Sequence, residues 1–340
     1  MTTPLNSRAD VLALLNGQRP ARVPCFSGLI NVTAPGLNQL DLRFSETHTD
    51  PQKMAAAAAS THRLFGFESA VAPLDLCVEA EALGAVVDFR ADEPEPMFPL
   101  IATPLIHHPD EFDATPPADF LQRGRLPMAR EALRLLRAEV GHEIVVGAFI
   151  PGPFTLAMQI SPLNNLLIEV ARAPQAIARL LGPLTDLLID VARSYREAGA
   201  DFLTVHEMGG SPGLIGPRAF EALVLPPLQK LLRALPRPRV LSVCGNTNRA
   251  LPQLAAAGAD ALSLDQLNDL ARTRAALGPD ALLFGNIDPV GVLANGTPAT
   301  VRAAVSAALA AGADAIWPGC DLWPSLPAEN MHAMIEAVHG

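Results

Sequence analysis

The sequence predicts an α/β fold in which eight parallel strands and the helices between them form a (β/α)8 barrel. Short apolar runs of strand length alternate with longer amphipathic stretches of helix length. Several of these stretches open with Pro, which suits the first turn of a helix. A Gly-Ala-Asp ending recurs in Arg196–Asp201, Ala256–Asp260 and Ala311–Asp314, where a helix ends at a Gly cap and a strand begins. This alternation favours parallel strands covered by helices.

Eight apolar runs have the length and composition of buried strands. They are Val23–Phe26, Glu68–Ala72, Ile144–Phe149, Phe202–His206, Val240–Val243, Ala261–Leu264, Leu282–Gly285 and Ala315–Trp317. The helical stretches among them are Met128–Glu139, Pro162–Arg172, Pro174–Leu181, Pro183–Ala198, Pro217–Leu235, Asn248–Ala257, Leu267–Leu277 and Thr300–Ala311. A barrel of this type takes about 250 residues. We assign the surplus of this chain to N-terminal helices at Arg8–Asn16 and Pro51–Phe65 and to a polar insertion at Asp92–Gln122, and we expect residues 1–340 to form one domain.

Composition argues against two classes of partner. Hydrophobic residues make up 49% of the chain and charged residues 18%, which is typical of a folded protein with a large core. The formal net charge is -10 and no basic run occurs, so we expect no nucleic-acid partner. No apolar stretch approaches the roughly 20 residues of a membrane span, and no signal-peptide core follows the N-terminus. We therefore expect a cytoplasmic protein without a membrane role, and the apolar composition is compatible with a homodimer.

Polar and thiol side chains follow most of the predicted strands. In a parallel barrel the C-terminal ends of the strands meet at one mouth, where functional groups gather. The side chains expected there include Asp75, His206, Glu207, Cys244, Asn246, Asp265, Asn286 and Cys320. This ring is acidic, amide-rich and thiol-bearing, unlike the glycine-rich, cationic site of a phosphate substrate.

Cys244 and Cys320 each lie just past a predicted strand, where two thiolates can bind a soft metal such as zinc. A catalytic zinc site takes three protein ligands and keeps one position open. Glu207, His206 or Asp265 could supply the third ligand. The alternative is that both cysteines are small buried hydrophobic residues.

His206 and Glu207 are adjacent, and a His beside a carboxylate could form an acid–base pair or a pair of ligands. Neighbouring residues of a strand point to opposite faces, so both face the barrel axis only if the strand has already ended. Asp75 is a third candidate catalytic group, because a carboxylate at the mouth could bind polar or cationic atoms of a substrate.

Five segments carry motifs of a known family: Phe67–Gly84, Gly152–Ala157, Gly285–Pro289, Pro318–Cys320 and Pro327–Asn330. On these segments the chain resembles the uroporphyrinogen decarboxylase superfamily, and within it the cobalamin-dependent methyltransferases. The resemblance extends over most of the chain. It implies a (β/α)8 barrel with its pocket at the C-terminal mouth.

Residue differences separate the chain from the decarboxylase branch. Porphyrinogen decarboxylases carry an Arg-rich N-terminal loop, a Tyr after the Thr-Leu motif and a His after the last strand. The matching positions here are Phe26–Thr33, which has no Arg, then Gln159 and Cys320. Asp75 alone matches their catalytic Asp. A mouth without cations would also disfavour an octa-anionic porphyrinogen.

Methyltransferases of the coenzyme M type bind zinc through a His-x-Cys pair after the fifth strand and a Cys after the eighth. Cys244 and Cys320 match two of these ligands, but Ser242 stands where the His is expected. The comparison therefore implies that Glu207 or Asp265 could replace the missing nitrogen, which would make a zinc site of two thiolates and one carboxylate.

The chemistry implied by the resemblance is methyl transfer between a corrinoid and a thiol or tetrahydrofolate acceptor. Zinc would lower the pKa of a thiol acceptor, whereas Asn246, Asp265 and Asn286 would hydrogen-bond a folate acceptor without zinc. No Asp-x-His-x-x-Gly corrinoid motif occurs, so the corrinoid would arrive as methylcobalamin or on a corrinoid protein. The alternatives are a tetrapyrrole decarboxylase that uses Asp75 and a non-catalytic protein that binds a tetrapyrrole or corrinoid.

Overall fold

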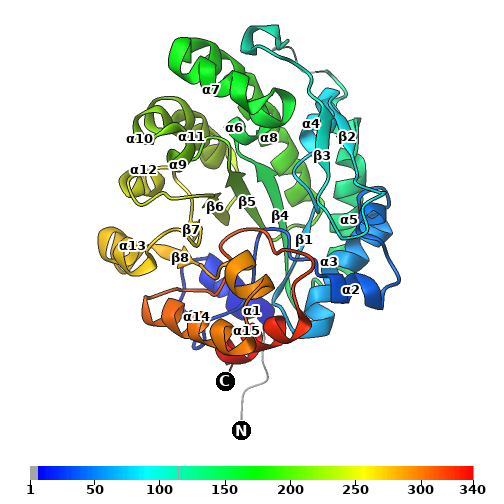
Figure 1. Ribbon diagram of the computed structural model, residues 1–340, viewed down its shortest axis with the longest axis vertical. Coiled ribbons are helices and arrows are strands. Elements are labelled where there is room, and N and C mark those ends of the chain that lie inside the picture. Colours follow the sequence, from blue (N-terminus) through cyan, green and yellow to red (C-terminus); the bar gives the residue numbers. More distant parts are fainter. Residues whose placement is uncertain (1–6, 114, 116, 340) are drawn as a thin grey trace.

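A parallel six-stranded sheet forms the centre of the molecule (Figure 1). The computed structural model describes residues 7–113, 115 and 117–339, and residues 1–6, 114, 116 and 340 of the expected domain lie outside the described part. The sheet has the order β1-β4-β5-β6-β7-β8, and each neighbouring pair is parallel. Its strands are β1 (Ser69–Ala72), β4 (Val145–Pro151), β5 (Phe202–Glu207), β6 (Arg239–Val243), β7 (Ala261–Leu264) and β8 (Leu282–Phe284).

Two short segments continue the ring of strands between β8 and β1. Ala315 forms a parallel bridge with Phe284 of β8, and Ile316 forms one with Cys25. The backbone N–H of Glu68, just before β1, donates a 3.0 Å hydrogen bond to the Cys25 carbonyl. The barrel arrangement is thus confirmed, but the expected strands at Val23–Phe26 and Ala315–Trp317 occur as isolated bridges, because each makes too few consecutive bonds to form a ladder.

Helices cover the outside of the barrel (Figure 1). Short 3-10 segments lie at Phe44–His48, Pro109–Glu111 and Phe120–Gln122, and π-helical turns at Phe220–Val224 and Pro289–Ala294. The α-helices are α1 (Ser7–Leu15), α2 (Ala34–Gln39), α3 (Pro51–Phe65), α4 (Val78–Leu83), α5 (Leu126–Glu139), α6 (Pro153–Ile160), α7 (Leu163–Arg172), α8 (Pro174–Glu197), α9 (Pro212–Ile215), α10 (Pro217–Ala219), α11 (Leu225–Ala234), α12 (Leu251–Ala255), α13 (Leu270–Leu277), α14 (Pro298–Ala310) and α15 (Ala328–His339).

Local sequence signals explain where many of these helices begin and end. At α3, the Asp50 side chain accepts 2.9 Å hydrogen bonds from the backbone N–H groups of Gln52 and Lys53, and Pro51 fills the first helical position. The helix ends at Gly66, whose φ of 79° is left-handed and favours glycine.

Two regions differ from the prediction. The helix α8 continues through Pro183, although the sequence suggested a break there; an interior Pro costs about 3 kcal/mol, and a long buried face that includes Leu180, Leu184 and Leu188 offsets it. The polar insertion contains β3 (Leu100–Thr103), which pairs antiparallel with β2 (Val86–Asp88) outside the barrel. These strands are short and mostly exposed, although Val86, Val87, Leu100 and Ile101 are apolar, and they lie in or next to a stretch that is polar as a whole.

The barrel interior changes from apolar to polar along its axis. Near the N-terminal ends of the strands it is filled by a cluster that includes residues of α1, and α1 lies at the same end of the molecule as α15 (Figure 1). Further along the same strand faces stand Thr204, Ser242 and Ser263, all buried. The polar half faces the mouth. The apolar cluster comprises Val11, Leu14, Leu15, Phe26, Val145, Phe202, Val240, Ala261, Leu282, Phe284, Ala315 and Trp317.

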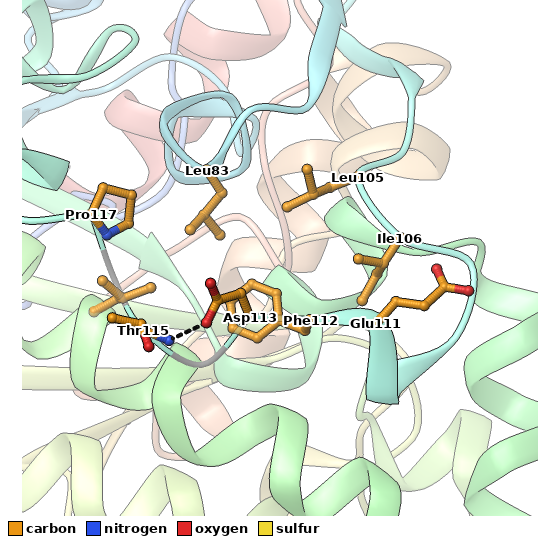
Figure 2. Close-up of a pocket in the computed structure, with 9 residues that line it drawn as sticks. Leu83, Leu105, Ile106, Glu111, Phe112, Asp113, Thr115 and Pro117 are labelled. Carbon is orange, nitrogen blue, oxygen red and sulfur yellow. Dashed lines mark hydrogen bonds between the residues drawn. The ribbon is translucent and has the colours of Figure 1, made fainter.

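A mostly apolar pocket of about 280 Å³ lies outside the barrel, where α4 and α8 meet the insertion (Figure 2). Leu83, Leu105, Phe112 and Leu187 supply much of its lining. None of the lining residues is among the side chains expected at the barrel mouth. Separately, no helix in the described part of the chain has the length and apolar character needed to cross a membrane.

Candidate metal centre

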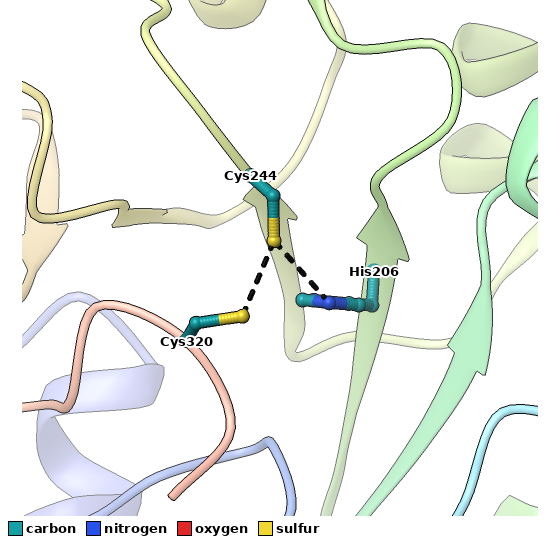
Figure 3. A group of neighbouring side chains, drawn as sticks. All are labelled: His206, Cys244 and Cys320. Atoms are coloured by element: carbon teal, nitrogen blue, oxygen red, sulfur yellow. Dashed lines mark hydrogen bonds between the residues drawn. The ribbon is translucent and has the colours of Figure 1, made fainter. Parts of the chain in front are cut away.

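Three potential metal ligands converge at the mouth of the barrel: His206, Cys244 and Cys320 (Figure 3). The Cys244 sulfur lies 3.5 Å from His206 Nε2 and 3.3 Å from the Cys320 sulfur. All three ligand atoms lie within 4.8 Å of one another. His206 is fully buried, and both cysteines are partly buried, so the group is largely enclosed.

The strand register places the imidazole in this group. His206 is on β5 and pairs directly with Ser242 on β6. Cys244 follows two residues after Ser242, so it continues on the same face of β6. Cys320 comes from the loop that follows the bridged segment at Ala315–Pro318. The nitrogen that the family pattern puts at position 242 is therefore supplied from the neighbouring strand.

The two thiols and the imidazole strongly affect one another. A hydrogen bond from the Cys244 thiol lowers the pKa of Cys320 below its usual range, and the His206 ring lowers it further. The same sulfur contact raises the pKa of Cys244. Burial opposes a charge on His206, but the contacts with Cys320 and Asp321 are stronger together and raise its pKa. One thiolate in this pair is favoured, which is the form that binds metals.

Glu207, expected as a metal ligand, lies on the opposite face of β5 from His206. Its Oε1 accepts hydrogen bonds of 2.7 Å from the Thr155 hydroxyl and 2.9 Å from Gly210 N–H, and its Oε2 accepts one of 3.1 Å from Phe154 N–H. Burial raises the pKa of Glu207, and these bonds oppose the rise. The strand extends through Glu207, so the two adjacent side chains diverge and this carboxylate anchors the start of α6 instead of joining the cysteines.

The three expected cofactor-binding residues take part in a network among the mouth loops. Asp265 accepts 2.8 Å hydrogen bonds from Gly245 N–H and Leu267 N–H. Asn286 donates to the carbonyls of Asp265 and Asn268. The exposed Asn246 accepts from the backbone and side chain of Asn248, so all three side chains already hold loop contacts.

The carboxylate of Asp75 is held by two neighbouring side chains, Arg125 and His48. Arg125 Nη1 lies 2.6 Å from its Oδ2, and His48 Nδ1 lies 2.8 Å from the same oxygen. Although burial opposes ionisation, Arg125 and His48 hold the pKa of Asp75 well below its usual range. Arg125 and His48 were not found from the sequence, because nothing in their local patterns marks them as partners of a residue after β1.

The donor set fits a catalytic zinc site. Two thiols and one imidazole supply the three protein ligands that such sites use, and a fourth position is left for a substrate or water. His206 Nδ1, the ring atom turned away from Cys244, is buried without a hydrogen-bond partner among the described residues. Nε2, the ring nitrogen near Cys244, is therefore the atom that would bind a metal at the cluster.

A family model described as uroporphyrinogen decarboxylase (URO-D) matches residues 6–340. The chain belongs to the URO-D family. The resemblance inferred from the motif segments is thereby confirmed.

Relatives of this URO-D family member include methyltransferases and decarboxylases. The methylcobamide:CoM methyltransferase MtaA of Methanosarcina barkeri is 30% identical over 332 residues, which cover 97% of this chain and 96% of the relative. A uroporphyrinogen decarboxylase of Trichlorobacter lovleyi is 26% identical over 313 residues, covering 87% of each chain. A solved structure, a methyltransferase from Methanosarcina mazei, matches with a TM-score of 0.93 and 28% identity over 98% of both chains. The chain is therefore similar throughout its length to methyltransferases of the corrinoid-dependent branch.

Proposed function

We propose that this protein is a methyltransferase that moves a methyl group between a corrinoid and a thiol, with the thiol bound at His206, Cys244 and Cys320. The convergence of these three ligand atoms within 4.8 Å carries the proposal. Full-length similarity to a methylcobamide:CoM methyltransferase supports the reaction class. His206, Cys244 and Cys320 would bind zinc, and this role is proposed for them because of their geometry.

Zinc at this site would bind the acceptor as a thiolate and so lower its pKa. The protein's own groups supply the rest. His206 and the two cysteines would position the acceptor sulfur at the mouth, and the buried carboxylate of Glu207 holds the first turn of α6 and the loop at Gly210 in place. The apolar lower half of the barrel leaves the mouth as the route for substrates.

A thiol acceptor is favoured over tetrahydrofolate because the cluster supplies soft ligands that suit a sulfur-binding metal. Asn246, Asp265 and Asn286, which were proposed to bind a pterin ring, each take part in hydrogen bonds within the loops. The methyl donor would be free methylcobalamin or a corrinoid protein that docks at the mouth.

Decarboxylation is disfavoured by the surroundings of Asp75. A catalytic carboxylate must reach its substrate, whereas both oxygens of Asp75 accept from Arg125, and His48 also contacts one of them. Asp75 is only 2% exposed. Its carboxylate has the contacts of a structural ion pair, which leaves methyl transfer as the better-supported reaction.

An anaerobic absorbance assay tests the proposal. When purified protein is supplied with zinc, methylcobalamin and a thiol, the absorbance spectrum of methylcobalamin should be lost. A methylated corrinoid protein can replace methylcobalamin as the methyl donor. Cys320→Ser should lower the rate by at least about 100-fold, since even the loss of an outer-shell partner costs about 10–100-fold. Cys77→Ser is the matched control, because Cys77 lies outside the cluster and contacts the Pro99 carbonyl. Corrinoid binding without turnover would favour a binding protein, and uroporphyrinogen turnover that needs Asp75 would establish the decarboxylase.

A further inference from the structure

Two carboxylates flank the cysteines of the cluster. Asp265 Oδ2 accepts a 2.8 Å hydrogen bond from the N–H of Gly245, the residue after Cys244. Asp321 directly follows Cys320, and its Oδ1 accepts a 2.8 Å hydrogen bond from Ile30 N–H. Each sulfur therefore has a carboxylate nearby, and backbone hydrogen bonds hold both carboxylates in place.

No Arg or Lys side chain pairs with the two carboxylates, as far as the described residues show. The recorded partners of their oxygens are backbone N–H groups, those of Gly245 and Leu267 for Asp265 and that of Ile30 for Asp321. The carboxylates that flank the cysteines therefore have no cationic partner of their own.

Two Arg side chains, those of Arg125 and Arg249, could be considered as cationic groups for an anionic substrate. Arg125 is bound to Asp75 and Glu81, both at 2.6 Å. Arg249 follows Cys244 by five residues in the chain, and its side chain is exposed.

We propose that the methyl acceptor is an aminothiol, a thiol with an ammonium group close to its sulfur. The assignment rests on the proposed function, in which the acceptor sulfur occupies the open position at the cluster. An ammonium group on a short tail would be attracted by Asp265 and Asp321, whereas a sulfonate would lose hydration and find like charges. Repulsion of the wrong substrate is a common source of specificity. The acceptor would thus differ in charge from the coenzyme M (CoM) in the relative's name.

Three two-carbon thiols that differ in the terminal group test the assignment: 2-aminoethanethiol, 2-mercaptoethanol and 2-mercaptoethanesulfonate, which is coenzyme M. Calorimetric titration into the full-length, zinc-supplemented protein, without a methyl donor, measures binding apart from activity. After correction for the thiolate fraction of each compound, the aminothiol should bind at least about tenfold more tightly than the sulfonate, with the alcohol between them.

Asp265→Asn and Asp321→Asn should each reduce the aminothiol-to-sulfonate ratio by about threefold or more, because one charge is removed. Asn keeps an oxygen that can accept the same backbone hydrogen bond. If these residues had only a structural role, the substitutions would instead weaken the binding of all three thiols alike. Arg249→Ala should leave the preference unchanged.

Each outcome bears on the assignment. Equal or tighter binding of the sulfonate would overturn it, and loss of that binding in Arg249→Ala would locate an anion site at Arg249 instead. The same thiols are then offered as acceptors with methylcobalamin. If the aminothiol binds best but no thiol is methylated, the proposed function fails and the binding preference stands. If the sulfonate is methylated fastest, methyl transfer stands and the aminothiol assignment fails; absence of binding by any thiol would refute both.

Discussion

His206 and Ser242 are directly paired residues on the neighbouring strands β5 and β6. Their side chains share the inner face of the barrel, and His206 Nε2 lies 3.5 Å from the sulfur of Cys244, two residues beyond Ser242. The His that is expected at position 242 of β6 thus has a counterpart, His206, at the paired position of β5. In this chain His206 lies beside Cys244 in place of the His expected at position 242, an exchange between paired positions.

The first prediction concerns this exchange. His206→Ala should lower zinc affinity by at least about 100-fold, since it removes a ligand and loss of an outer-shell partner alone costs about 10–100-fold. The double variant His206→Ser with Ser242→His should recover part of that affinity, because it moves the imidazole to the paired position. Zinc competition against a chromogenic chelator measures both effects. An unchanged affinity in His206→Ala would remove this residue from the site.

Glu207→Gln is the matched control for the third ligand. Its carboxylate is hydrogen-bonded to Thr155, Phe154 and Gly210, so zinc stoichiometry should stay the same while thermal stability falls. A zinc loss in Glu207→Gln comparable with that of His206→Ala would instead support a carboxylate ligand.

The second prediction concerns the two cysteines, whose sulfurs lie 3.3 Å apart. In the zinc-free protein, oxidised glutathione should join Cys244 to Cys320 by thiol–disulfide exchange: the glutathione disulfide is reduced to two thiols, and the two cysteines lose two electrons and two protons. Mass spectrometry of peptides should find this link and a loss of two hydrogens. Bound zinc should slow the reaction. Cys25 and Cys77 are the internal controls, since burial raises the pKa of each thiol and should keep them unreactive.

The third prediction concerns the buried ion pair of Asp75 and Arg125. Arg125→Met should reduce the free energy of unfolding by about 3–5 kcal/mol at pH 7, because it leaves a buried carboxylate without its guanidinium. Arg125 lowers the pKa of Asp75 in the folded state, so the stability that this pair contributes is present above the unfolded pKa of about 3.9 and is lost as the pH falls below it. Urea denaturation at pH 7 and pH 3 should therefore show a smaller difference between variant and parent in acid.

Arg134→Met provides the comparison, since Arg134 forms an exposed pair with Glu131 and such pairs contribute about 0–1 kcal/mol. If Arg125→Met were no more destabilising than Arg134→Met, Asp75 would have to be stabilised without its ion pair.

The fourth prediction concerns Glu79, which is buried beside Tyr195. Burial raises the pKa of Glu79 to about 8, and the Tyr195 hydroxyl donates a 3.2 Å hydrogen bond to its carboxyl. A folded pKa above the unfolded value of about 4.3 means that stability is full below that value and is lost as the pH rises through about 8. Glu79→Gln should remove this loss and melt at a higher temperature than the parent at pH 9.

Thermal melts from pH 5 to pH 9 measure the effect, and Glu336→Gln, which alters an exposed carboxyl, should follow the parent. Parallel pH profiles for the parent and Glu79→Gln would show that Glu79 does not exchange its proton on unfolding.

Periodicity was a good guide where a segment is buried on a regular face. The strand predicted at Ala261–Leu264 has the same bounds as β7, and Pro51–Phe65 has those of α3. The pattern failed for β2 and β3, which are short and mostly exposed even though apolar residues form most of each strand. It also failed at Pro183, where tertiary packing outweighs a local helix breaker.

The sequence by itself determined the barrel, the family and the two cysteines at strand ends, because these depend on local composition, strand length and motif spacing. Only the tertiary structure decided which side chain joins Cys244 and Cys320, and that Asp75 is paired with Arg125, 50 residues away in the chain. The physical reason is that side chains alternate between the two faces of a strand. The partner of a side chain at the mouth therefore depends on where each strand ends and on the register between strands, and both are long-range properties that no single segment encodes.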